Sequence, residues 1–224
     1  MVDRMVSLSV GIMLSTSLLH ALPTAFESGT SPHSLFAVLM GGLLAFFLLE
    51  KMAILRHSHH HEGDGHHHEH GHDAQEAGKA GWMILIGDGM HNFTDGILIA
   101  AAFLADPSLG FITALAIIAH EIPQEIGDFI VLLNAGFSRK RAYFYNLLCS
   151  LMAVFGGVLG YFTLEHAKEL IPYVLVLASS GFLYIAVSDL MPQMQRRATL
   201  KETIPQVILI ACGVILVVFV TQHR

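Results

Sequence analysis

Residues 143–164 read YFYNLLCSLMAVFGGVLGYFTL, and no side chain in this stretch carries a charge. A helix needs about 20 mostly apolar residues to cross the hydrocarbon core of a bilayer, so the stretch predicts a membrane-spanning helix. Six further stretches have the same character, and their length without polar alternation favours helices over barrel strands. The predicted spans are 6–24, 35–55, 81–104, 109–133, 143–164, 171–190 and 204–221.

The composition of the whole chain agrees with these spans. Of its 224 residues, 54% are apolar and 13% are charged, and the mean hydropathy is +0.59. Soluble domains carry about 25% charged residues, so a disordered chain, a nucleic-acid-binding domain and an ordinary soluble enzyme are excluded. We predict an all-α, polytopic transmembrane bundle that forms one domain over residues 1–224, without enzymatic activity or a catalytic cofactor.

The basic residues predict how the chain is oriented. Ten of the twelve lysines and arginines fall on one side of the predicted spans, and basic loops tend to stay in the cytoplasm. The sequence therefore predicts a protein of the plasma (inner) membrane with a cytoplasmic amino terminus and an external carboxyl terminus. The ten residues are Arg4, Lys51, Arg56, Lys79, Arg139, Lys140, Arg141, Arg196, Arg197 and Lys201.

The loop at 56–79 is of low complexity and contains HSHHHEGDGHHHEHGHD at 57–73. Its glycines and charges predict a flexible segment without a core. Imidazole is a common ligand of divalent transition metals, so we expect this loop to capture metal at the cytoplasmic surface. The nine histidines are His57, His59, His60, His61, His66, His67, His68, His70 and His72.

Two neighbouring spans contain polar side chains at bilayer depth, where ionisable groups cost about 3 kcal/mol each. The first reads GDGMHNFTDG at 87–96, and the second reads AHEIPQEIGDF at 119–129. Helical spacing places His91 and Asp95 on one face, and likewise Glu121 and Glu125. Mixed nitrogen and oxygen ligands suit Zn²⁺, Fe²⁺, Mn²⁺ or Cd²⁺. The cluster comprises Asp88, His91, Asn92, Asp95, His120, Glu121, Gln124, Glu125 and Asp128.

Small and cyclic residues accompany this cluster. Pro123 cannot donate a backbone hydrogen bond, so the carbonyl of Ala119 is predicted to be free beside the polar side chains. Gly87, Gly89 and Gly96 are predicted to allow a partner helix to approach closely.

The order of HNFTDG and, one span later, HEIPQEIGDF resembles the ZIP (Zrt/Irt-like) family of divalent-metal transporters, in particular the branch whose fifth helix carries HEXPHE. The His-rich loop and the FFLLEK end of the preceding span fit the same pattern. The resemblance implies that a two-metal transport site falls on His91, Asn92, Asp95, His120, Glu121 and Gln124. It implies pathway or neighbouring positions at Asp88, Glu125, Asp128, Asn146, His20 and Asp189.

The resemblance further implies uptake of zinc into the cytoplasm, with iron, manganese and cadmium as alternatives, and a homodimer. Two departures stand out. Gln124 replaces the second histidine of HEXPHE, which affects the metal preference. The family has eight helices, and the predicted seven correspond to its second to eighth, so a first helix is expected to be missing.

Two other classes of membrane protein contain parts of this motif pattern. Cation diffusion facilitators carry HxxxD, which HNFTD satisfies, and a His-rich loop, but the span number and the second motif differ. An intramembrane zinc protease would need HExxH, and here Gln124 replaces the second histidine. Neither class, nor any nucleic-acid partner, is favoured by the sequence.

Overall fold

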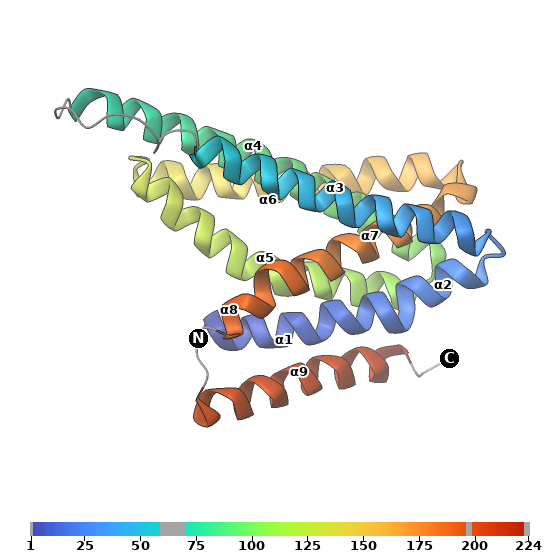
Figure 1. Cartoon of the computed structure of the whole chain (residues 1–224). Helices are drawn as coiled ribbons and strands as arrows, with labels where there is room; N and C mark the ends of the chain where they lie inside the picture. Colours follow the sequence, from blue (N-terminus) through green and yellow to red (C-terminus); the bar gives the residue numbers. More distant parts are fainter. Residues whose placement is uncertain (1, 59–69, 196–198, 222–224) are drawn as a thin grey trace.

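The computed structural model describes residues 2–58, 70–195 and 199–221, and every regular element within these ranges is helical (Figure 1). The all-α prediction is therefore confirmed. Elements η1 and η3 are π-helical and η2 is a 3₁₀ turn. In chain order the elements are α1 (Val2–Ser15), η1 (Thr16–Ala21), α2 (Leu22–Glu27), α3 (Pro32–Ser58), α4 (His70–Ala105), α5 (Pro107–Asn134), α6 (Arg139–Glu165), η2 (Lys168–Leu170), α7 (Ile171–Ile185), η3 (Ala186–Leu190), α8 (Met191–Gln195) and α9 (Leu200–Thr221).

Five helical stretches of the described chain are long and apolar enough to cross a membrane. They are Arg4–Glu27, Pro107–Asn134, Arg139–Glu165, Lys168–Gln195 and Leu200–Thr221. The spans predicted at 35–55 and 81–104 lie in α3 and α4. Helix α3 contributes a shorter apolar stretch, Pro32–Leu48, and α4 has the length but is not among these five stretches. Those two spans stay predictions.

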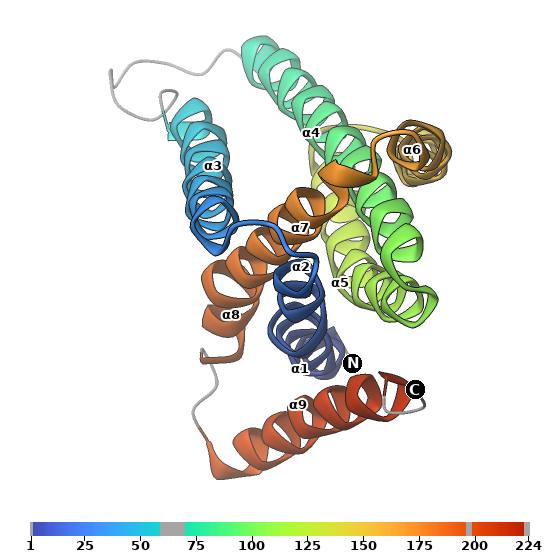
Figure 2. The same ribbon diagram turned by 90° about the vertical axis from the view of Figure 1, so that its right-hand side faces the viewer.

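The helices form a bundle in which α4 packs against α5, α6 and α7. Helix α1 packs against α5 and α9, and α3 packs against α7 (Figure 2). The main apolar core lies around α1, α5 and α7, and a smaller one joins α4, α5 and α6. Many large apolar side chains of α6 and α9 are exposed, as expected for surfaces that face lipid. The two chain ends lie at opposite ends of the bundle (Figure 1).

Pro123 lies inside α5, and the carbonyl that it cannot bond is satisfied by another helix. The carbonyl of Ala119, four residues before Pro123, is reached by the hydroxyl of Ser9, which donates to it at 2.5 Å. Ser9 belongs to α1, so the freed carbonyl is satisfied by another helix. This bond, together with the packing of α1 on α5, fixes the part of α5 that follows Ala119.

The contact between α4 and α6 depends on glycine. A Cβ atom at Gly96 would overlap the carbonyl oxygen of Ala153, and one at Gly156 would overlap the carbonyl oxygen of Phe93. The prediction for Gly96 is therefore confirmed, with α6 as the partner helix. The prediction for Gly87 is wrong, because nothing lies within 4 Å of a Cβ at that position, and Gly89 makes only ordinary contacts.

We expect Gly96→Ala to lower the free energy of unfolding by about 1–3 kcal/mol, because the added methyl group must push α6 away. The matched control is Gly87→Ala on the same helix, which has open space and gains helix propensity. Thermal unfolding in detergent, followed by circular dichroism, measures both. Equal melting temperatures for the two variants would show that the α4–α6 distance is not limited by this glycine.

Candidate metal site

Helices α4 and α5 bring together four side chains that the sequence singled out: His91, Asp95, His120 and Glu121. Asp95 Oδ2 lies 3.6 Å from His91 Nε2 and 3.4 Å from His120 Nε2. Glu121 Oε1 lies 3.4 Å from His91 Nε2 and 3.5 Å from His120 Nε2. Two nitrogens and two oxygens thus alternate around one point.

These four atoms have the spacing of a metal-ligand set. Zinc binds its ligands at about 2.0–2.1 Å, so the edges of its coordination tetrahedron measure about 3.3–3.4 Å. The four nitrogen–oxygen separations lie close to that length, and all four atoms are within 4.8 Å of one another. Each is buried and forms no hydrogen bond with any residue that the structure describes. A cation at the centre would satisfy all of them.

The imidazole of His120 is oriented by its own helix. Its Nδ1 lies 3.0 Å from the carbonyl oxygen of Ala116, and because a carbonyl only accepts, Nδ1 carries the hydrogen. When the ring is neutral, as metal ligation requires, this hydrogen bond leaves the lone pair of Nε2 directed to the cluster. The ring is 2% exposed and packs edge-on against Phe182 of α7, with centroids 6.0 Å apart. The orientation of the His120 ring is therefore fixed by its own helix and by α7.

The charges of the cluster match a divalent ion. Asp95 and Glu121 bring two negative charges into the bundle, and their ion-pair partners among the described residues are the two imidazoles. Metal ligation requires ionised carboxylates and neutral imidazoles. In that state the four side chains carry a net charge of about −2, and buried charges are costly unless they are paired or coordinate a metal. A divalent cation would neutralise the cluster.

A second group, made of oxygen ligands, adjoins the first through Glu121. One carboxylate oxygen each from Asp88, Glu121 and Glu125 lies within 4.8 Å of the others. The amide nitrogen of Asn92 donates to Asp88 Oδ1 at 3.0 Å, and Asp88 Oδ2 is buried without a hydrogen-bond partner in the described chain. Asn92 thus organises a carboxylate of this group through its amide nitrogen.

Helix α6 supports this second group. Asn146 donates from its amide nitrogen to the Glu125 carbonyl at 2.9 Å, which places it beside the group as the sequence suggested. Ser150 donates to Glu125 Oε1 at 2.6 Å, and sequence reasoning missed it. The signal was available, because Ser150 lies four residues after Asn146 on the same helix face. Ser9 and Phe182 were missed too, because their roles depend on contacts between distant helices.

Three of the remaining predicted residues, Gln124, Asp128 and Asp189, line a cavity of about 450 Å³ between α5 and the η3–α8 segment. His120 and Gln124 form part of its wall, and Asp128 and Asp189 line it further along. Asp189 Oδ1 accepts a hydrogen bond from Gln193 Nε2 at 2.8 Å. Gln124 thus lies beside His120, one turn further along α5. The cavity connects the His-containing cluster with more polar side chains.

Two other predictions fall elsewhere. His20 Nε2 lies 2.8 Å from the Thr221 hydroxyl, at the contact of η1 with α9, and His20 belongs to neither metal-type group. Its pathway role stays a prediction. The loop histidines at 57–72 lie outside the residues whose side chains are described.

Together, the fold and the cluster define a polytopic α-helical membrane protein with metal-type ligands between two adjacent helices. The chain belongs to the ZIP zinc transporter family: the family model described as "ZIP Zinc transporter" matches residues 53–221. The motifs HNFTDG and HEIPQEIGDF both lie within the matched region.

Individual relatives agree with this assignment. "Zinc transporter ZIP10" of Mus musculus is 41% identical over 152 residues, which cover 65% of this chain and 18% of that protein. "Zinc transporter ZIP13" of Pongo abelii is 30% identical over 232 residues, covering 96% of this chain and 65% of that protein. "Metal cation symporter ZIP14" of Xenopus tropicalis is 40% identical over 119 residues, covering 53% of this chain and 25% of that protein. The chain thus spans less than two thirds of the length of each.

We expect Asp95→Ala and Glu121→Ala to weaken Zn²⁺ binding by at least about 100-fold, because loss of even a supporting partner costs 10–100-fold. Each change removes a ligand atom and one of the two buried negative charges. Competition with a chromophoric chelator, on the protein in detergent, measures the Kd. The matched control is Glu165→Ala, an exposed carboxylate at the end of α6. A Kd unchanged in both site variants would contradict the ligand assignment.

Proposed function

We propose that this protein transports divalent transition-metal ions across the membrane, with zinc as its main substrate. The observation that carries the proposal is the convergence of four unsatisfied ligand atoms from His91, Asp95, His120 and Glu121 inside the bundle. The mixed nitrogen and oxygen ligands suit zinc as well as other divalent transition metals, and zinc is chosen because the relatives are named as zinc or metal-cation transporters. Asn92 and Gln124 complete the proposed site as neighbouring amide ligands.

The proposed route runs from this cluster towards the bundle end that carries the amino terminus. The second group, formed by Asp88, Glu121 and Glu125, lies one helical turn further in that direction on both antiparallel helices. The cavity lined by Asp128 and Gln193 continues the same way, and α8 packs against α1, which begins at this end of the bundle (Figure 1). An ion could therefore pass between carboxylates without losing all of its ligands at once.

We assign this end to the cytoplasm, because most of the basic residues fall there. Movement into the cytoplasm then corresponds to release through the cavity. Alternating access around a site between the helices, with closure on the opposite side, is the mechanism that suits such a bundle. The resemblance to the family supports a homodimer in the plasma membrane as the working assembly.

Zinc flux into proteoliposomes tests the proposal. We expect uptake of Zn²⁺ by the wild-type chain, loss of uptake in Asp95→Ala and Glu121→Ala, and normal uptake in Glu165→Ala. Parallel assays with Fe²⁺, Mn²⁺ and Cd²⁺ rank the substrates. Flux at the wild-type rate in both site variants, at equal protein content, would refute transport through this cluster.

We expect Gly127→Phe to slow flux at least about tenfold, equivalent to a barrier raised by about 1.4 kcal/mol, while the Kd for Zn²⁺ stays unchanged. Gly127 lines the cavity, and a Cβ at this position would meet nothing within 4 Å, so a large side chain there starts from open space at the cavity wall. Gly87→Phe is the matched control, because it also has open space but lies outside the cavity. Unaltered flux in Gly127→Phe would place the route elsewhere.

We propose that the loop histidines hold metal near the exit and do not form the transport site. Deletion of 57–72 is expected to preserve flux and to change its apparent affinity, because nine imidazoles raise the local metal concentration. The corresponding peptide should bind several Zn²⁺ ions at neutral pH and release them below about pH 6, where imidazole becomes protonated. Complete loss of flux in correctly inserted deletion protein would instead place the loop in the conduction path.

A further inference from the structure

Three aromatic rings from separate elements meet at one end of the bundle. The ring centroids of Trp82, Phe137 and Tyr145 lie 5.8 Å (Trp82–Phe137), 5.0 Å (Trp82–Tyr145) and 5.9 Å (Phe137–Tyr145) apart, in edge-to-face arrangements. The turn after α5 holds Phe137 in place. Gly136 adopts a positive φ of 87°, and the Phe137 N–H donates to the Leu132 carbonyl at 3.0 Å, as in a Schellman cap. The aromatic cluster is therefore anchored by backbone geometry.

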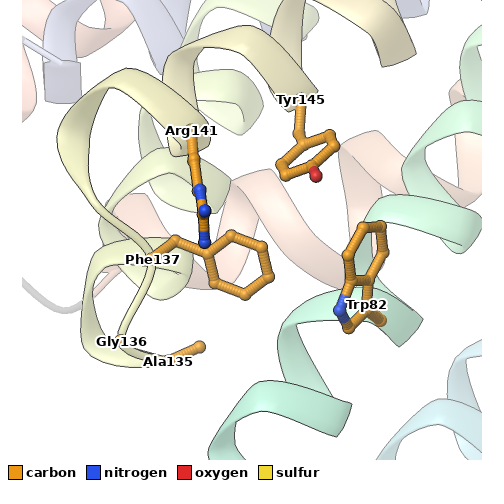
Figure 3. Close-up of a pocket in the computed structure, with 6 residues that line it drawn as sticks. All are labelled: Trp82, Ala135, Gly136, Phe137, Arg141 and Tyr145. Atoms are coloured by element: carbon orange, nitrogen blue, oxygen red, sulfur yellow. The ribbon is translucent and has the colours of Figure 1, made fainter.

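These rings and Arg141 line a cavity of about 250 Å³ (Figure 3), with Ala135 and Gly136 at its edge. Arg141 extends from α6 towards Phe137, and Trp82 stands across from them on α4. The indole nitrogen of Trp82 is on the side towards Phe137. The cavity thus combines an aromatic wall with a guanidinium group and an indole donor, and none of the described residues that line it carries a carboxylate.

The positive charge around this cavity is not balanced within the described chain. Arg139, Lys140 and Arg141 are consecutive, exposed and located in the first turn of α6, where there is no acidic residue. A helix amino terminus carries a partial positive charge, so cations there are unfavourable. None of the three forms an ion pair with a described residue. An anion from outside the chain would relieve this repulsion.

The location of the cavity favours a lipid as the source of this anion. The turn joins two candidate spans, Pro107–Asn134 and Arg139–Glu165, so it lies at the level of the headgroups. Tryptophan and tyrosine are enriched at that level, and basic pockets between spans bind anionic headgroups. The neighbouring rings of Tyr143 and Phe144 are 66% and 57% exposed, so they offer an apolar surface to acyl chains.

We infer that the cavity formed by Trp82, Phe137, Arg141 and Tyr145 binds the headgroup phosphate of an anionic phospholipid. The phosphate accepts hydrogen bonds from the Arg141 guanidinium, and the acyl chains lie along the exposed rings of α6. A soluble phosphate would use the guanidinium alone and would leave the aromatic wall without a ligand. The inference is independent of metal transport, because none of the four proposed zinc ligands lines this cavity.

Trp82 is the only tryptophan of the chain, so its fluorescence reports on this cavity alone. The full chain is reconstituted in phosphatidylcholine vesicles that contain, at equal mole fraction, either brominated phosphatidylglycerol or brominated phosphatidylcholine as a contact quencher. We expect the relative association constant to favour phosphatidylglycerol about fivefold, the factor expected for one basic residue near the surface. Arg141→Gln should abolish this preference, whereas Arg141→Lys should keep most of it.

Arg139→Gln is the matched control, because Arg139 lies in the same turn but does not line the cavity. The Arg139→Gln variant should prefer phosphatidylglycerol over phosphatidylcholine more strongly than the Arg141→Gln variant does. Equal quenching by the two lipids in the wild-type chain would overturn the inference. Equal loss in Arg139→Gln and Arg141→Gln would also overturn it, because it would indicate only general attraction of a basic surface. Loss of the preference on addition of inorganic phosphate would assign the cavity to a soluble anion instead.

Discussion

The structure depends on one electrostatic constraint: two carboxylates and two imidazoles share a small volume inside a membrane bundle. Asp95 and Glu121 have no lysine or arginine as an ion-pair partner in the described chain. Placing two uncompensated carboxylates in a low-dielectric interior is expensive, so the arrangement is stable only if a cation enters or a proton is bound. In the proposed function, a divalent cation supplies this positive charge and is replaced by another when it leaves.

The surrounding helices hold these side chains in position. Glycine at Gly96 and Gly156 lets α6 approach α4 closely, and from this position α6 supplies Asn146 and Ser150 to the second group of carboxylates. Pro123 weakens α5 at the same depth, and Ser9 of α1 compensates for the lost hydrogen bond. The backbone carbonyl that α5 leaves without a helical hydrogen bond is therefore satisfied by another helix.

The proposed metal site and the proposed lipid site occupy different parts of the same helices. The metal-type groups lie in the middle of α4 and α5, whereas the aromatic cavity lies at the turn between α5 and α6. Because Trp82 and Asp88 belong to one continuous helix, a lipid that steadies α4 at Trp82 would also steady the carboxylate of Asp88, about two turns further on. The two sites can be tested separately, since they share no residue.

The sequence by itself determined the class of the fold, the identity of the candidate ligands and the helix faces on which they lie. Long apolar stretches can only be satisfied as helices in lipid, and the i, i+4 spacing fixes which side chains share a face. Only the tertiary structure decided which helix faces pack against each other. It grouped His91, Asp95, His120 and Glu121, directed the Asn92 amide to Asp88, and placed Gln124 on a cavity wall. It also showed that α4 contacts α6 closely at Gly96 and not at Gly87. Distances between helices depend on side chains far apart in the chain, which local spacing does not encode.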